Sequence, residues 1–151
     1  MSIGSNQNLV IAGTGTVKLN WNTFSAQGTT NLTITNSLTE LNLAGQGLSS
    51  TEKVLEFEGN FETTAFDPAK FQILYAGTNE LKLRGSNSLA ATIYAPNAYV
   101  DLASDYDVYG SILCKTFKNS GGAMVHYDTS LSAKYKTLGN RVMSSFSWKK
   151  Y

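Results

Sequence analysis

Residues 92–103 read TIYAPNAYVDLA, and residues 73–84 read ILYAGTNELKLR on a similar plan. Near the N-terminus, residues 9–20 read LVIAGTGTVKLN. Each stretch has a short apolar run, a break that contains Gly, Pro or Asn, and a second run in which apolar and polar residues alternate. A unit that recurs along a chain is typical of a repeat architecture. The three stretches are therefore interpreted as copies of one repeating unit.

The related units begin at intervals of 23, 22, 19, 19 and 19 residues. Their first residues are Leu9, Leu32, Val54, Ile73, Thr92 and Ser111. Alternation with a period of two, bounded by turn-forming residues, predicts short strands joined by corners. We therefore expect an all-β fold, a single-stranded, right-handed β-solenoid (parallel β-helix) of about six coils with a C-terminal cap. An antiparallel β-sandwich is the alternative, because short alternating strands also fit it.

Alignment of the last units predicts which side chains stack in columns. One inward column is predicted to contain Leu74, Ile93 and Ile112, and a second Ala76, Ala95 and Cys114. Four more residues are predicted to face inward: Leu81, Leu83, Val100 and Leu102. Because side chains alternate along a strand, Tyr75 and Tyr94 are predicted to face outward in one row. Tyr99 is predicted to lie on the next face of the same coil.

The whole chain, residues 1–151, is predicted to form a single β-solenoid domain. Residues 1–8 are expected to be a polar lead-in, and residues 9–128 are expected to form the coils. The repeat fades in the remaining segment, which contains apolar residues that could close the core. Residues 129–151 are therefore predicted to be a cap or a returning strand.

Composition excludes several classes of partner. Charged residues make up 15% of the chain and the formal net charge is +1, so no nucleic-acid partner is expected. The sequence has no apolar run near the length of a membrane span, so no membrane insertion is expected within this chain.

Cys114 is the only cysteine, and an intrachain disulfide cannot form. A targeting segment is expected to lie outside this sequence.

Few residues suggest chemistry. His126 is the only histidine, which is too few for the common zinc sites, and no signature of a Ser-His-Asp triad accompanies it. The acidic candidates are a calcium-type group, Asp101, Asp105 and Asp107, and a carboxylate pair, Glu56 and Glu58. The first does not match the spacing of an EF-hand loop, and an exposed pair on a solenoid is commonly inactive. We therefore predict no catalytic residues, no metal site and no cofactor.

The predicted outward tyrosines favour binding. Tyr75, Tyr94 and Tyr99 would form a row of aromatic rings on a rigid sheet, where ring faces can meet the C–H bonds of sugars. The alternative is that stacked tyrosines only stabilise neighbouring strands.

The C-terminal half resembles a known family. The motifs are Tyr94-Ala95-Pro96-Asn97-Ala98, Tyr109-Gly110-Ser111, His126-Tyr127-Asp128 with Leu131, and a closing SFSWKKY. Over residues 70–151 they resemble the C-terminal β-helical domain of PilX-like, type IV pilus-associated bacterial surface proteins. The resemblance implies an exported protein, located outside the cell or on the bacterial cell surface. A more distant likeness is to the tapirins, β-helical proteins that attach to cellulose.

The function predicted from the sequence is a noncatalytic, extracellular surface or pilus-associated module that mediates attachment. Its partner would be a polysaccharide such as cellulose, or another surface ligand, with pilus or cell-surface proteins as further partners. The first alternative is a self-assembling scaffold similar to bactofilins, which polymerise through their ends. The second is a polysaccharide-cleaving enzyme, because several parallel β-helices have that activity.

Overall fold

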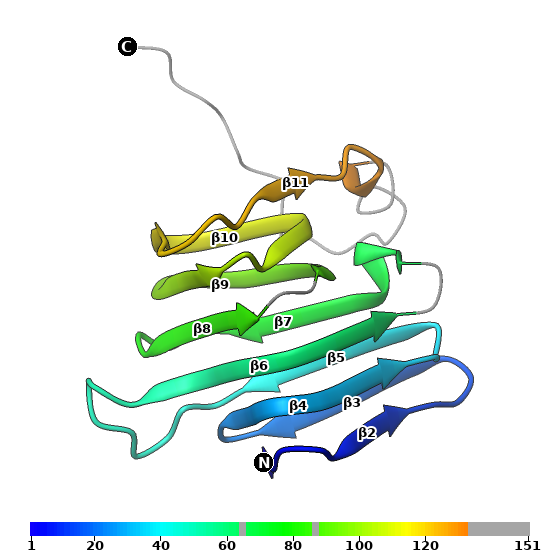
Figure 1. Ribbon diagram of the computed structural model, residues 1–151, viewed down its shortest axis with the longest axis horizontal. Coiled ribbons are helices and arrows are strands. Elements are labelled where there is room, and N and C mark those ends of the chain that lie inside the picture. The colour runs from blue at the N-terminus through cyan, green and yellow to red at the C-terminus, as the bar shows by residue number, and fades with distance from the viewer. Residues whose placement is uncertain (64–65, 86–87, 133–151) are drawn as a thin grey trace.

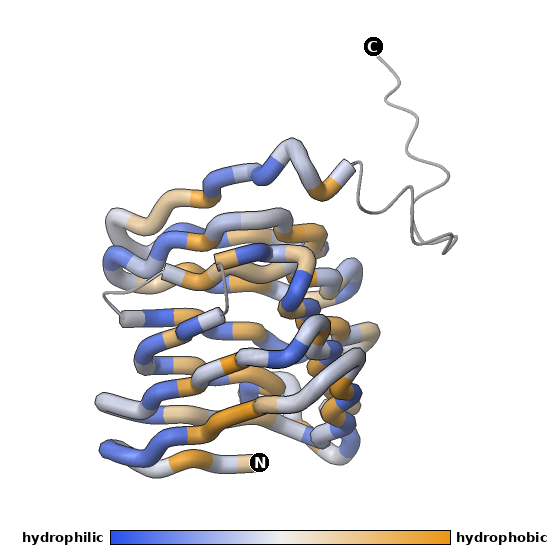
Figure 2. Tube along the Cα trace, turned by 90° about the vertical axis from the view of Figure 1, so that its right-hand side faces the viewer, coloured by the Kyte–Doolittle hydropathy of each residue, from blue (hydrophilic) through white to orange (hydrophobic). Residues whose placement is uncertain are grey.

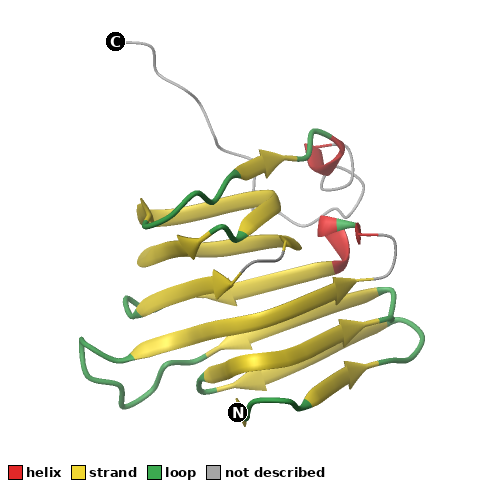
Figure 3. Ribbon diagram, in the orientation of Figure 1, coloured by secondary structure: helices red, strands yellow, loops and turns green. Residues whose placement is uncertain are grey.

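The computed structural model describes residues 1–63, 66–85 and 88–132 (Figure 1). These residues form strands joined by loops, with only short helical turns (Figure 3). The strands are β1 (Ser2–Ile3), β2 (Asn8–Ile11), β3 (Thr16–Trp21), β4 (Phe24–Ile34), β5 (Leu38–Leu43), β6 (Lys53–Thr63), β7 (Phe71–Tyr75), β8 (Glu80–Gly85), β9 (Ser88–Ser104), β10 (Asp107–Asn119) and β11 (Val125–Tyr127). A 3-10 helix, η2 (Pro68–Lys70), precedes β7.

Every strand pairing within the described residues is parallel. The 17-residue strand β9 joins two parts of the sheet, because its first half pairs with β7 and its last part pairs with β8. In Figure 1, β4, β6 and β8 lie in front of β3, β5 and β7. The result is a curled parallel sheet, compatible with a β-solenoid. The antiparallel sandwich considered as the alternative is wrong.

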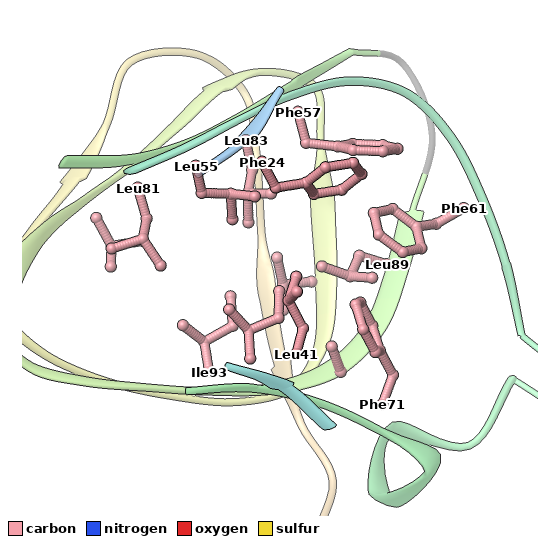
Figure 4. Packing of buried hydrophobic residues seen from close by; sticks show 14 of the residues in the cluster. Phe24, Leu41, Leu55, Phe57, Phe61, Phe71, Leu81, Leu83, Leu89 and Ile93 are labelled. Atoms are coloured by element: carbon pink, nitrogen blue, oxygen red, sulfur yellow. The ribbon is translucent and has the colours of Figure 1, made fainter. Parts of the chain in front are cut away.

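Apolar side chains stack in register inside the curled sheet (Figure 4). One inward column contains Phe24, Leu55, Leu81 and Val100, and another contains Leu19, Leu41, Ile73, Ile93 and Ile112. Most of these side chains are buried, and burial of each contributes roughly 1.5–3 kcal/mol. The inward placement predicted for Leu81, Leu83, Val100 and Leu102 is confirmed. Figure 2 shows the matching alternation of hydrophobic and hydrophilic residues along the strands.

An aromatic series runs through this core. It consists of Trp21, Phe24, Phe57, Phe61 and Phe71, with successive ring centroids 5.0, 6.0, 4.2 and 5.1 Å apart. All four pairs are tilted, a geometry that aromatic rings favour over a direct sandwich. Apart from the half-buried Trp21, this aromatic series lies inside the sheet, and it links β3, β4, β6 and β7.

The predicted columns are wrong by one residue at β7. Ile73 pairs with Ile93, and Leu74 pairs with Tyr94. Since side chains alternate along a strand, a shift of one residue moves every side chain to the opposite face. Leu74 therefore lies on the outer side, Ala76 is exposed, and Tyr75 is only 3% exposed.

The predicted lead-in and the predicted cap can each be compared with part of the structure. Ser2 and Ile3 pair with β4 and Ile3 is buried, so pairing begins within the segment expected to be a lead-in. Of the predicted cap or returning strand, only residues 129–132 are described. Leu131 is buried there, and the remainder lies outside the described residues.

The segment before β7 packs against the outside of the later strands. Pro68 is buried, and Gly110 of β10 allows this close approach. A Cβ atom at Gly110 would lie 2.9 Å from the Pro68 Cβ atom and 2.0 Å from the Ala91 carbonyl oxygen. Gly110 also has a φ of 143°, which side-chain-bearing residues rarely adopt. In the described part of the chain, no helix is long and apolar enough to cross a membrane.

Candidate functional site

The outward contact predicted for Tyr75 is wrong, because Tyr75 belongs to a buried polar corner. Its hydroxyl donates to Asn79 Oδ1 at 3.0 Å and accepts from the Asn79 backbone N–H at 3.2 Å. The Asn79 side-chain amide in turn donates to the carbonyl oxygens of Ser49 and Glu52, at 2.7 and 3.0 Å. Buried polar groups need such partners. Tyr75 therefore fastens the loop before β6 to the corner after β7.

Tyr94 does face outward, and strand register defines its neighbours. We use "the Tyr94 column" for the five in-register residues Asn20, Asn42, Leu74, Tyr94 and Leu113. Tyr94 is half-buried and lies between Leu74 and Leu113, which are also half-buried. At the other end, Asn42 Nδ2 donates to Asn20 Oδ1 at 3.0 Å. The column is uncharged along its whole length, with amides at one end and apolar surface at the other.

Tyr99 lies in another column. It is half-buried, pairs with Thr116 of β10, and follows the corner that contains Pro96 and Asn97. Asn97 holds this corner by donating through Nδ2 to the Ala76 carbonyl oxygen at 2.9 Å. Tyr94 pairs instead with Leu74 and Leu113 on the other side of the corner. The structure thus does not bring the three predicted tyrosines into one row.

A second outward column on β9 contains alternating charges. We use "the charge column" for the in-register residues Glu56, Lys82, Asp101 and Lys118. Lys82 Nζ lies 3.7 Å from Asp101 Oδ2, and Ser120 Oγ donates to Asp101 Oδ1. Asp101 is only 4% exposed. Opposite charges on adjacent strands attract, so this column stabilises the stack.

The predicted carboxylate pair is divided between two ion pairs. Glu56 Oε1 lies 2.6 Å from Lys53 Nζ, and Glu58 Oε2 lies 2.8 Å from Arg84 Nη2. The hydrogen bond from Lys53 holds the pKa of Glu56 below its usual value. A general acid needs a raised pKa. Glu56 therefore does not have the electrostatic environment that such a residue requires.

The three aspartates of the predicted calcium-type group have different surroundings. Asp101 is buried in the charge column, and Asp107 Oδ1 accepts from the Met124 backbone N–H at 2.7 Å. Asp105 is exposed at the corner before β10. Across residues 1–63, 66–85 and 88–132, no group of three His, Cys, Asp or Glu side chains has the arrangement of a metal site.

An aromatic cluster that sequence reasoning did not identify lies near the C-terminal end. Tyr109 stacks on His126, with centroids 4.2 Å apart and an interplanar angle of 12°, and Phe66 meets Tyr109 edge-on at 5.1 Å. His126 Nε2 is 3.5 Å from Asp107 Oδ2. Tyr109 and His126 are in register, so the repeat could have indicated their contact. The position of Phe66 depends on the segment before β7 and has no such signal.

The sole cysteine packs beside the core, as predicted. Cys114 pairs with the fully buried Ala95 and is itself half-buried. Burial raises the pKa of the Cys114 thiol, which disfavours the reactive thiolate. Tyr106 is fully buried, and burial raises the pKa of its hydroxyl as well. Tyr106 therefore belongs to the core and not to the surface.

Comparison with known proteins gives a family without an assigned activity. A family model described as a domain of unknown function, DUF7305, matches residues 4–134. None of the curated proteins matches this chain, and none of the solved structures matches it.

Proposed function

We propose that this chain, which belongs to the DUF7305 family, is a noncatalytic attachment module that binds polysaccharide through the Tyr94 column. The observation that carries the proposal is the place of Tyr94. It is half-buried, faces outward, and lies in register between Leu74 and Leu113. Together these side chains form an apolar strip on the outside of a hydrogen-bonded sheet.

Such a strip suits the face of a sugar ring. Sugar rings present C–H bonds on their faces and hydroxyls on their edges, and aromatic side chains combine an apolar body with a polar tip. The backbone beneath Tyr94 is held by parallel pairing on both sides of β9. Little conformational entropy would therefore be lost when a ligand binds.

We further propose that the module is displayed outside the cell, on the bacterial surface or on a pilus. The support is the resemblance of residues 70–151 to PilX-like surface proteins. We also propose that the curled sheet is a right-handed solenoid of about six coils, closed by a cap within residues 129–151. Successive parallel pairings from β1 to β11 support the coiling.

Retention on insoluble polysaccharides tests the binding function. We expect the wild-type chain to be retained on cellulose or another uncharged glycan. Replacement of Tyr94 by Ala should reduce retention about tenfold, the loss expected when one aromatic contact of roughly 1.4 kcal/mol is removed. Tyr99→Ala is the matched control on the same strand. Equal retention of wild type and Tyr94→Ala, or no retention of wild type on any glycan, would refute the proposal.

A self-assembling scaffold is the second candidate, and the strand edges favour it. Within the described residues, β11 pairs only with Val108–Gly110 of β10, and β3 pairs only with β5. Unpaired edges are templates for further strands. Sedimentation at rising concentration distinguishes the two candidates. Filaments that grow with concentration would favour the scaffold, and a constant sedimentation coefficient would favour the attachment module.

A further inference from the structure

We infer that the ligand is a linear, uncharged polysaccharide that lies along the stack of strands rather than across it. This inference rests on the proposed function and adds the ligand's orientation, charge and minimum length. It depends on the Tyr94 column as a whole, including the two asparagines at its N-terminal end.

Strand register sets the orientation. Leu74, Tyr94 and Leu113 belong to the successive strands β7, β9 and β10, so their apolar strip runs perpendicular to the strands. A ligand that lay along a single strand would contact only one of the three. A ligand that follows the stack contacts all of them and continues over Asn42 and Asn20.

The asparagines provide hydrogen-bonding groups at the end of the strip. Asn42 uses Nδ2 to donate to Asn20 Oδ1. The other polar atom of this amide, Oδ1, is an acceptor. Among the described residues, Asn42 Oδ1 accepts no hydrogen bond from another side chain. It can therefore accept a hydrogen bond from a sugar hydroxyl, and the exposed Nδ2 of Asn20 can donate one.

The charged pair beside the two asparagines favours an uncharged ligand at that end of the column. Lys18 and Glu40 flank the asparagines on β3 and β5, and they pair with each other, with Nζ and Oε2 2.8 Å apart. The two charges cancel, so they provide neither a basic patch for an acidic glycan nor an acidic patch for an amino sugar. Discrimination should therefore depend on ring faces and hydroxyls.

The number of strands that the Tyr94 column crosses sets the length of the ligand. At roughly 4.8 Å between neighbouring strands, the five residues of the column extend over about 19 Å. This length exceeds a single sugar residue several-fold. Affinity should thus increase with oligosaccharide length until the column is covered, and then remain constant.

Calorimetric titration of the full chain with cello-oligosaccharides, from disaccharide to hexasaccharide, tests the inference. We expect affinity to increase at least tenfold across the series. Asn42→Ala should weaken the longest oligomer about threefold and leave the shortest unchanged, and a carboxylated glucan of the same length should bind no better. Asn31→Ala is the matched control, because this asparagine lies in a different column.

The outcomes separate the two levels of the proposal. If wild type binds and Tyr94→Ala does not, but affinity is independent of length and of Asn42, the orientation along the stack is wrong and the attachment function remains. Tighter binding of the carboxylated glucan would refute the uncharged ligand. Failure of every glycan to bind would refute the attachment function itself. Circular dichroism spectra that match between variants show that each variant folds.

Discussion

The Tyr94 column and the charge column both cross β9, yet their side chains interact in opposite ways. In the charge column, Lys82 lies in register between Glu56 and Asp101, and the buried Asp101 carboxylate has Lys82 and Ser120 as partners within the protein. In the Tyr94 column, Tyr94 lies between Leu74 and Leu113, and none of these three side chains carries a charge.

The difference follows from parallel, in-register stacking. Each outward side chain has the residues of its own column as its nearest neighbours on adjacent strands. Charged residues must alternate in sign to be stable there, whereas neutral residues can be adjacent without repulsion. The charge column is therefore stabilised within the protein, and the Tyr94 column is the one that we propose for ligand binding.

Reversal of one charge should destabilise the charge column strongly. Lys82→Glu would place three acidic side chains on successive strands, with Glu56 and Asp101 on either side. Because Lys82 is a quarter exposed, we expect the free energy of unfolding to fall by about 2 kcal/mol, less than for a fully buried pair. Urea denaturation measures the loss, and Lys82→Met, which keeps the apolar stem, is the control. Equal stability of the two variants would contradict a structural role for the charges.

Removal of one hydroxyl should show that Tyr75 and Tyr94, on the adjacent strands β7 and β9, have different roles. Tyr75→Phe removes the hydroxyl that bonds Asn79 Oδ1 and the Asn79 backbone N–H in a buried corner, so the free energy of unfolding should fall by about 1.5 kcal/mol. Retention on polysaccharide should not change. Tyr94→Phe is the matched control and should leave stability within about 0.5 kcal/mol of wild type. A loss of retention in Tyr75→Phe, with stability unchanged, would indicate that Tyr75 contacts the ligand.

An amide ladder gives a third comparison within the uncharged residues. Asn60 Nδ2 donates to Asn31 Oδ1, and Asn31 Nδ2 donates to Asn8 Oδ1, each at 2.8 Å. Asn31→Ala removes both bonds, and we expect a loss of about 1 kcal/mol because the ladder is partly exposed. Asn42→Ala removes a single bond and should cost less. Thermal unfolding of the two variants ranks them, and the reverse order would contradict the assignment of Asn31 to structure and Asn42 to the ligand.

The smallest effect concerns acid stability at one end of the charge column. The hydrogen bond from Lys53 lowers the pKa of Glu56 in the folded state. The stability that this carboxylate contributes is therefore complete above its unfolded pKa, about 4.3, and is lost as pH falls through the lower folded value. The stability difference between wild type and Lys53→Met should decrease as pH falls below about 4.3. A difference independent of pH would show that the ion pair contributes nothing.

Much of the fold could be predicted from the repeat, because alternation and period are local properties. The step of nineteen residues holds between Leu81 and Val100 and between Leu83 and Leu102, where the inward placement is confirmed. The parallel strands follow from the same period. The predicted step of 22 residues from Leu32 to Val54 is wrong, because Leu32 pairs with Phe61. A long loop before β6 separates these units.

The error in the predicted binding row has a specific cause. The shared letters Tyr-Ala at residues 75–76 and 94–95 suggest an alignment that the structure contradicts. The step from Ile73 to its partner Ile93 is one residue longer than the step from Leu81 to its partner Val100. The corner after β7 contains this extra residue, so it is one residue longer than the corner between Tyr94 and Tyr99. Tyr75 fills that longer corner together with Asn79. Sequence alone cannot distinguish a lengthened corner from a lengthened strand, and only one of these leaves Tyr75 outside.

Disulfide trapping tests the register of Leu74 and Tyr94 most directly. In a Cys114→Ala background, Leu74→Cys combined with Tyr94→Cys would place two thiols on one face of adjacent strands. Their Cα atoms would lie about 4.8 Å apart, within the range that a disulfide requires. We predict that this pair cross-links under mild oxidation and that Tyr75→Cys combined with Tyr94→Cys does not. Cross-linking of the second pair and not of the first would place Tyr75 on the outer face and contradict the Tyr94 column.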